Sequence, residues 1–274
     1  MITAFLGKGG VGKTSVASAY ALYCSRRGRT AIVSSDFMPS LRYIFREERE
    51  NLDVIELSEK EVSGRWKFRY GDQVAAVLKE FVEVEDWIID HIASSPGVAE
   101  EFMIANIVEL EESGKYDYVV WDTAASSSTM HLLLLEREFY EHLDRDIKIY
   151  LRLKNRFRIS KTFNILEEWK NLANRVWDRM QETRFHIVTT MDELSLVQTG
   201  EIKEDIENMG LKVDGTVYNR CREVPEQRAV RSIVIPELNG SSMEIVEAME
   251  NYVAPLHSNR KKSREMQKSL THYS

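Results

Sequence analysis

The sequence has few cysteines, no long apolar run and no excess of basic residues. Its 274 residues include only Cys24 and Cys221, too few for a disulfide framework. The aliphatic run at 132–135 is far shorter than the roughly 18 residues that a membrane-spanning helix needs. The formal net charge is −7, so overall charge does not favour binding to nucleic acid. These features exclude a disulfide scaffold and predict no transmembrane segment.

The remaining composition is that of an ordinary globular protein with a sizeable core. The chain is 43% hydrophobic and 30% charged, and its length suggests one large or two small domains. A strand-like apolar run begins at residue 2 and leaves no room for a signal peptide. Together with the low cysteine content, this predicts a reducing, cytoplasmic location.

Strand-like runs alternate with helical patterns along the chain. The runs are short, apolar and rich in β-branched residues, and the segments between them carry apolar residues at helical spacing. Such alternation predicts a doubly wound α/β fold with a mostly parallel sheet. The seven expected strands lie at 2–6, 29–35, 52–57, 116–122, 184–190, 211–219 and 232–235.

Two stretches, 71–113 and 132–183, are expected to form a small helical subdomain inserted in this fold. In the second stretch, apolar residues recur at helical spacing over 163–180, which predicts an amphipathic helix. The segment 147–160 fits a strand or a helix equally well, so its structure stays open.

A glycine-rich loop follows the first expected strand. It reads GKGGVGKT at 7–14 and fits the phosphate-binding pattern GxxxxGK[ST], with a strand before it and a helical pattern after it. Glycines let backbone N–H groups converge on phosphate oxygens, and the helix N-terminus adds positive potential. We expect Lys13 to reach the terminal phosphates, Thr14 to place its hydroxyl on Mg²⁺ and Ser15 to contact the α-phosphate. The expected nucleotide-binding residues of the loop are Gly9, Gly10, Val11, Gly12, Lys13, Thr14 and Ser15.

A second lysine, Lys8, stands five residues before Lys13 in the same loop. It leaves from the first turn of the loop, too far round to duplicate Lys13. Two interpretations remain open at this point: an exposed, solvated lysine, or one that reaches phosphates bound by another subunit.

Two carboxylates follow expected strands and complete a candidate catalytic set. Asp122 ends the strand at 116–122, where a Walker B aspartate holds the water shell of Mg²⁺, although such a residue also suits a turn. Asp36 follows the strand at 29–35, at the edge where ligands of doubly wound folds bind. It could orient or deprotonate an attacking water, or cap a helix, and its position alone does not decide between these roles.

Six segments occur in an order that resembles one family of ATPases. They are KGGVGKT (8–14), SSDFMPSLRYIF (34–45), SPGVAEEF (95–102), DTAASSSTMHLL (122–133), VYNRC (217–221) and IPELNGSS (235–242). The first resembles the deviant Walker A motif that nitrogenase iron protein and MinD share. Together they resemble the ArsA-like branch, which comprises arsenical pump-driving ATPases and tail-anchored-protein targeting ATPases. The resemblance covers residues 1 to about 255 and is weakest in the helical insert. We therefore expect one P-loop ATPase domain at 1–255, and a basic tail at 256–274 that is disordered or a frayed helix.

The resemblance implies roles for individual residues. Lys8 matches the signature lysine that crosses a dimer interface to the partner's phosphates, which implies a homodimer around two ATP molecules. Asp36 matches the residue that positions water. Asn219 matches the strand-end residue that reads adenine, and Pro236 lies in the A-loop that packs on the base. ATP and Mg²⁺ are the implied cofactors.

The chain departs from the family pattern in both switch segments. In switch I, Phe37 replaces a proline, Ser40 an asparagine and Tyr43 an aspartate. In switch II, residues 125–128 read ASSS where the family has Pro-Thr-Gly-His. Loss of the glycine at Ser127 removes conformational freedom from a moving segment. The catalytic set of Lys8, Lys13, Thr14, Asp36 and Asp122 is complete, so we expect ATP hydrolysis to ADP and phosphate, which the altered switches could slow.

The cysteine content also departs from both branches of the family. The zinc-linking CxxC of targeting ATPases and three cysteines for arsenite or antimonite are absent, so we expect no zinc site. Cys24 is interpreted as a core residue.

The helical insert gives little information about a client. Within 132–183 the only methionine is Met180, whereas targeting ATPases have a methionine-rich groove. The segment 145–161 carries seven basic residues, which suits a solvated helix face, an acidic partner or peripheral contact with an anionic membrane. We do not expect nucleic acid, because no aromatic-interleaved binding platform is present.

Three functions remain in competition. The first is an ATPase whose dimer opens and closes to handle a client protein or drive a membrane partner. The second is a metallocentre-maturation or MinD-like ATPase, which would need exposed paired cysteines. The third is a nucleotide-dependent regulator that hydrolyses ATP slowly or not at all.

Overall fold

The computed structural model describes the chain except for residues 37–39, 80–84, 96, 125–159, 223–231 and 271–274. The ambiguous segment 147–160 except for its last residue, most of the basic stretch and the altered part of switch II therefore lie outside the described residues.

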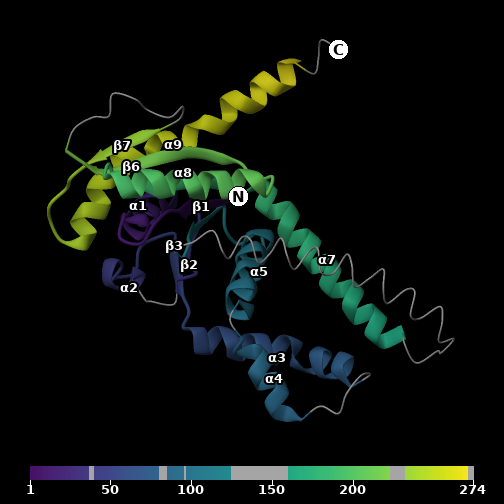
Figure 1. The fold of residues 1–274 in the computed structure, drawn as a ribbon. Helices are drawn as coiled ribbons and strands as arrows, with labels where there is room; N and C mark the ends of the chain where they lie inside the picture. The colour runs from purple at the N-terminus through teal and green to yellow at the C-terminus, as the bar shows by residue number, and fades with distance from the viewer. Residues whose placement is uncertain (37–39, 80–84, 96, 125–159, 223–231, 271–274) are drawn as a thin grey trace.

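A seven-stranded sheet with the order β3-β2-β4-β1-β5-β6-β7 forms the centre of the molecule (Figure 1). Every pair of neighbouring strands runs parallel, so all carboxyl ends meet at one edge. This confirms the doubly wound α/β fold and all seven expected strands, with bounds within about two residues. The strands are β1 Ile2–Leu6, β2 Thr30–Ser34, β3 Leu52–Glu56, β4 Tyr118–Asp122, β5 Arg184–Thr189, β6 Val213–Cys221 and β7 Ile233–Pro236.

Helices cover both faces of the sheet. Side chains alternate between the faces, so Ala4 and Leu6 contribute to one core cluster and Phe5 to the other. The first face is covered by α5 (Val98–Glu112), α8 (Glu193–Asn208) and the ends of two further helices. The second is covered by α1 (Lys13–Ser25), α2 (Leu41–Ile44) and α9 (Ser242–Leu270).

The helical region extends away from the sheet (Figure 1). It comprises α3 (Glu59–Leu78), α4 (Asp86–Ala93) and α7 (Ser160–Glu182), which pack around α5. The amphipathic helix expected over 163–180 is confirmed by α7. The region starts earlier than the expected residue 71, because Ser58 and Glu61 form a capping box that begins α3.

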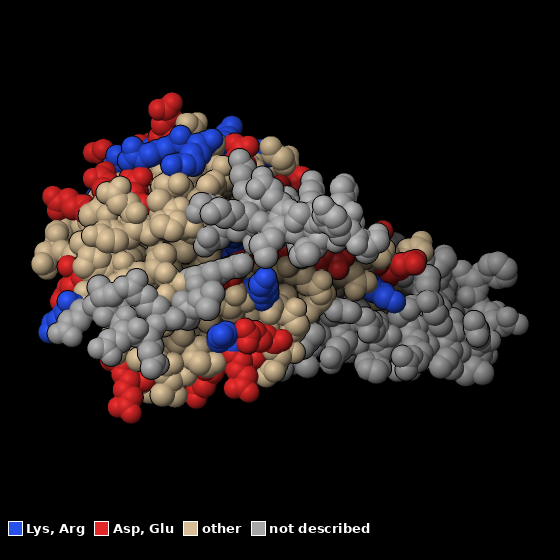
Figure 2. Space-filling model, turned by 90° about the horizontal axis from the view of Figure 1, so that it is seen from above, with Lys and Arg blue, Asp and Glu red and all other residues tan. Residues whose placement is uncertain are grey.

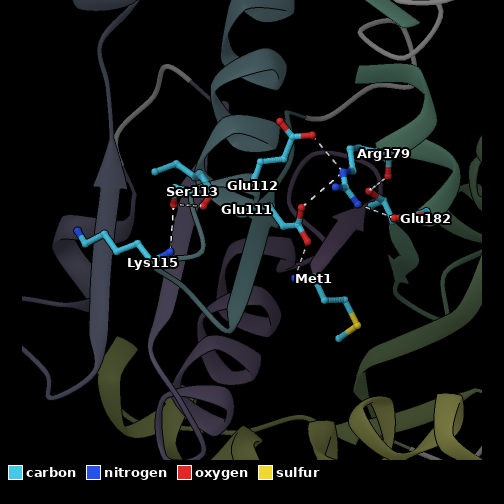
Figure 3. A network of polar contacts seen from close by, with 9 residues as sticks. Met1, Glu111, Glu112, Ser113, Lys115, Arg179 and Glu182 are labelled. Atoms are coloured by element: carbon cyan, nitrogen blue, oxygen red, sulfur yellow. Dashed lines mark hydrogen bonds and ion pairs between the residues drawn. The ribbon is translucent and has the colours of Figure 1, made fainter. Parts of the chain in front are cut away.

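Ion pairs join α5 to α7 at the amino edge of the sheet (Figure 3). Arg179 contacts Glu112 at 3.2 Å, Glu182 at 2.8 Å and Glu111 at 3.7 Å. Glu111 also pairs with the amino group of Met1 at 3.0 Å. These side chains are partly exposed, so each pair is worth at most about 1 kcal/mol.

The expected tail at 256–274 is mostly helical. The final helix, α9, continues to Leu270 and thus includes most of residues 256–274. No described helix is long and apolar enough to cross a membrane.

On the face in Figure 2, basic side chains gather mainly in one group at the rim, and acidic side chains surround it. The described part of this face offers no extended basic surface for a nucleic-acid backbone.

Candidate nucleotide site

The phosphate-binding loop connects β1 to α1 at the carboxyl edge of the sheet. Two of its glycines are required by their surroundings. Gly7 has a φ of 145°, and a Cβ there would lie 2.2 Å from the carbonyl oxygen of Val188. Gly12 has a φ of 91°, and its Cβ would lie 2.4 Å from Nδ2 of Asn219. The loop is thus wedged between its own helix and the ends of β5 and β6.

Lys13 lies where the loop ends and α1 begins. Its side chain is only 8% exposed, and Nζ donates a hydrogen bond to the carbonyl oxygen of Lys8 at 3.2 Å. Burial lowers the pKa of this ammonium, and the charges of Asp122 and Asp36 oppose that change. A buried ammonium beside a helix N-terminus is an arrangement that binds anions such as phosphate.

Asp122 and Thr14 meet beside Lys13. Asp122 is 1% exposed and forms a hydrogen bond with the Thr14 hydroxyl. Among the described residues, its Oδ1 has no hydrogen-bond partner. Burial raises the pKa of this carboxyl to about 7, against the hydrogen bond from Thr14 and the charge of Lys13. A buried carboxylate oxygen that lacks a partner, next to a hydroxyl, fits the oxygen ligands that Mg²⁺ prefers.

Asp36 joins this group because β2 and β4 are neighbours in the sheet. Its charge acts on both Lys13 and Asp122, and its backbone N–H donates to Oγ of Ser34 at 3.2 Å. The structure therefore brings Lys13, Thr14, Asp122 and Asp36 together, as the sequence predicted from separate motifs.

Lys8 differs from these four residues in its contacts. It is half-exposed, and its ammonium forms no hydrogen bond or ion pair with any described residue. Its charge is the smallest of the contributions that lower the pKa of Asp192 to about 2; the largest is a hydrogen bond from Ser195. Lys8 thus retains its hydrogen-bonding capacity at the rim of the site.

Asn219 connects the end of β6 to the loop. It is 1% exposed, and Nδ2 donates to the carbonyl oxygen of Val11 at 2.8 Å. Its Oδ1 is buried without a partner among the described residues. Such an acceptor suits an exocyclic amino group of a base. Pro236 ends the neighbouring strand β7, beside Cys221.

The remaining predicted residues lie in the loop and in the first turn of α1. Gly9 and Gly10 are exposed at the turn of the loop and Val11 is buried beneath it. Ser15 is half-buried in the first turn of α1. Of the predicted departures, Phe37 and residues 125–128 fall outside the described part of the chain.

Three residues of the site were missed by the motif analysis. Glu56 ends β3 and accepts hydrogen bonds from the start of α2. Ser35 accepts from Nε1 of Trp121 at 2.9 Å and from the backbone N–H of Ala124 at 3.3 Å. Arg220 has a φ of 56° and donates to the carbonyl oxygen of Gly10 at 3.2 Å. For Glu56 a signal was available, because it ends a strand as Asp122 does.

The two cysteines are buried and do not belong to a metal-ligating group among the described residues. Both Cys24 and Cys221 are buried, and burial raises the pKa of both thiols, that of Cys24 to about 12. Within the described ranges, no group of three or more His, Cys, Asp and Glu residues is arranged to hold a metal ion. Neither thiol is therefore available as an exposed thiolate that could bind a metal ion.

Comparisons with known proteins identify the family of this chain. The chain is similar to a putative arsenical pump-driving ATPase 2 of Aquifex aeolicus, with 27% identity over 79% of this chain and 78% of that protein. It is 25% identical to a putative arsenical pump-driving ATPase of Chlorobaculum tepidum, over 82% of this chain but 62% of that protein. It is 23% identical to ATPase ASNA1 homolog 1 of Paramecium tetraurelia, over 78% and 73%. The profile of the anion-transporting ATPases matches residues 1–265. Since that match spans nearly the whole chain, this protein belongs to the anion-transporting (ArsA) ATPase family, and the reaction its site serves is ATP hydrolysis.

Proposed function

We propose that this chain is a Mg²⁺-dependent ATPase that works as a homodimer and couples ATP turnover to a client held by its helical region. The observation that carries this proposal is the buried pair of Asp122 and Lys13. A carboxylate oxygen without a described partner and a desolvated ammonium are costly in a folded protein unless a ligand completes them. Mg²⁺ and the phosphates of ATP supply the matching charges.

Each residue then has a defined task in binding. Lys13 and the backbone N–H groups of the loop hold the β- and γ-phosphates. Thr14 and Asp122 would hold the Mg²⁺ shell, and the bound ion would supply positive charge for the phosphates. Asn219 accepts a hydrogen bond from the adenine amino group at Oδ1, and Pro236 packs near the base.

Asp36 acts on the attacking water. Its position next to Lys13 and Asp122 places a carboxylate at the phosphate end of the site. From there it orients the water and accepts its proton as the bond to phosphorus forms. The β–γ bridging oxygen of ATP leaves on ADP.

Lys8 supports the dimer. Within its own subunit its ammonium has no described partner, although it lies in a loop built to bind phosphates. We infer that it contacts the phosphates bound by a second copy and neutralises charge in the transition state.

Steady-state turnover and oligomeric mass, measured with and without Mg²⁺ and ATP, test the proposal. Asp36→Asn should reduce turnover to a small residual rate and keep ATP binding. Lys8→Ala should lower turnover and weaken the ATP-dependent dimer, whereas Lys60→Ala, an exposed lysine on α3, should change neither. ATP binding and dimerisation with no turnover above the Asp36→Asn background would favour a nucleotide-dependent regulator instead.

The helical region bears on the client. A cavity of about 70 Å³ lies among α3, α5 and α7, with Trp66, Tyr70, Phe102 and Leu172 in its walls. In the same helical region, Phe68 of α3 is 94% exposed and Trp87 of α4 is 61% exposed. Exposed aromatic side chains favour an apolar client segment over a polar partner.

This preference for an apolar client segment can be tested directly. A synthetic apolar helix should bind and stimulate ATP turnover, and Phe68→Ser should reduce that stimulation without changing basal turnover. Stimulation by anionic phosphatidylglycerol vesicles alone would favour a membrane partner.

A further inference from the structure

Glu56 lies where β3 ends, and its carboxylate holds the start of α2. It accepts hydrogen bonds from the backbone N–H groups of Ser40 at 2.5 Å, Leu41 at 2.9 Å and Arg42 at 3.4 Å. The side chain of Ser40 forms no capping hydrogen bond to this helix. A residue on a neighbouring strand therefore supplies the N-terminal cap of α2.

The short helix α2 depends on such contacts. It has four residues, and a helix of that length is not stable on its own. Leu41 is fully buried and Ile44 is 8% exposed, both in the core cluster beneath the loop. The helix is thus fixed on two sides, by the core below it and by the carboxylate of Glu56 at its first turn.

This attachment lies four residues after Asp36. On the other side of Asp36, the chain is fixed to the sheet. The backbone N–H of Ser35 donates to the carbonyl oxygen of Asp122 at 3.1 Å, and that of Asp36 donates to Ser34 Oγ. Asp36 is therefore held by the sheet on one side, and Ser40, four residues further along, is held by Glu56.

We infer that Glu56 is a positioning residue for ATP hydrolysis, which fixes the far end of the segment that starts at Asp36 and so sets where the Asp36 carboxylate lies. The inference rests on the proposed role of Asp36. Glu56 acts through backbone hydrogen bonds and contacts neither Lys13 nor Thr14 in any described interaction. Its charge nevertheless reaches the site: burial is the main cause of the raised pKa of Asp122, and Glu56 adds to it.

Glu56→Gln tests the inference with the least change in shape. The amide replaces one acceptor oxygen with a donor and removes the charge, so the backbone N–H groups of α2 lose part of their cap. We expect kcat to fall about 10- to 100-fold, because a shift of about 1 Å in a catalytic group has that effect. The KM for ATP and the binding of a fluorescent ATP analogue should stay unchanged, since the phosphate-binding loop is untouched. Glu59→Gln, an exposed residue three positions along, is the matched control and should behave as the wild type.

The combination with Asp36→Asn separates positioning from general stability. If Glu56 acts through Asp36, the double variant should be no slower than Asp36→Asn alone. Glu56→Asp, which keeps the charge but shortens the reach, should also lower kcat and serves if Glu56→Gln does not fold. A wild-type kcat in Glu56→Gln, or effects that multiply in the double variant, would overturn the inference alone. Full turnover in Asp36→Asn would overturn both the proposed role of Asp36 and this inference.

Discussion

The carboxyl and amino edges of the sheet carry polar groups of opposite kinds. At the carboxyl edge of the sheet, Asp122 and Asn219 are buried, and each has an oxygen without a partner among the described residues. At the amino edge, where α5 meets α7, Arg179 and its glutamates are partly exposed and fully engaged with one another (Figure 3).

The difference distinguishes a site built for a ligand from a junction built for the fold. A buried polar atom without a partner lowers the stability of the protein and is retained where a ligand completes it. Exposed ion pairs satisfy one another, contribute little free energy and allow helices to shift. On this basis, changes at the carboxyl edge should affect turnover, and changes at the amino edge should affect little.

The largest effect is expected for Asp122→Asn. The amide keeps the shape but loses the charge that Mg²⁺ requires, so Mg²⁺-dependent turnover should fall on the order of 100- to 1000-fold. The nucleotide-free protein should lose stability as well, because the buried ammonium of Lys13 loses the larger of its two opposing charges. Turnover assays and urea unfolding without nucleotide measure the two quantities. Asp117→Asn, an exposed residue just before the start of the same strand, should leave turnover unchanged. Full turnover in Asp122→Asn would show that Asp122 is only structural.

Gly12→Ala should have the next largest effect. The residue needs a left-handed conformation that costs about 1–2 kcal/mol for alanine, and the new Cβ would collide with Asn219. We expect ATP affinity to fall by at least about tenfold as the loop and the contact of Asn219 with Val11 are displaced. Calorimetric titration with ATP measures this.

The control for that change is Gly64→Ala on α3, where a Cβ meets nothing within 4 Å. It should leave ATP affinity unchanged and stabilise the helix by up to about 1 kcal/mol. Equal affinities for the wild type and Gly12→Ala would contradict the tight fit of the loop against β6.

The sequence predicted the carboxyl edge better than the contacts that organise it. The strand ends, Lys13, Thr14, Asp36 and Asp122 could be read locally, because a short motif or an apolar run announces each of them. Glu56 and Arg220 could not be assigned partners, because those partners lie 14 or more residues away and depend on strand order and backbone conformation. The start of α3 was missed although the capping box at Ser58 was present in the sequence.

His186 challenges the comparison, because it is a buried group without partners among the described residues and has no assigned role in the nucleotide site. Both ring nitrogens lack hydrogen bonds among the described residues, and the ring packs on Phe5 at 5.7 Å. Burial, with the charge of Arg184, lowers its pKa to about 3. The unfolded chain therefore takes up the proton first, at about pH 6.5, and stability is lost as the pH falls from 6.5 towards 3, by up to about 1.4 kcal/mol per pH unit.

His186→Phe should remove this contribution to the acid side of the stability curve, whereas replacement of the exposed His91 by Asn should keep it. Urea unfolding at pH 7, 6 and 5 measures the slope. If the unfolding free energy of His186→Phe depends on pH as in the wild type, other groups cause the loss of stability in acid. His186 would then be no exception to the difference between the two edges of the sheet.

The smallest effect is expected for Arg179→Met, and it tests the other half of the comparison. The side chain is 36% exposed, and its three contacts with Glu111, Glu112 and Glu182 are open to solvent. Unfolding free energy should therefore fall by less than about 1 kcal/mol, with basal turnover unchanged, and high salt should reduce the difference further. The exposed Lys212, replaced by Met, controls for loss of a positive charge on the surface. A loss of more than about 3 kcal/mol would mean that the network behaves as a buried one. In that case α5 and α7 would move as one body, and the helical region would transmit changes at the nucleotide site rigidly instead of by small adjustments of exposed pairs.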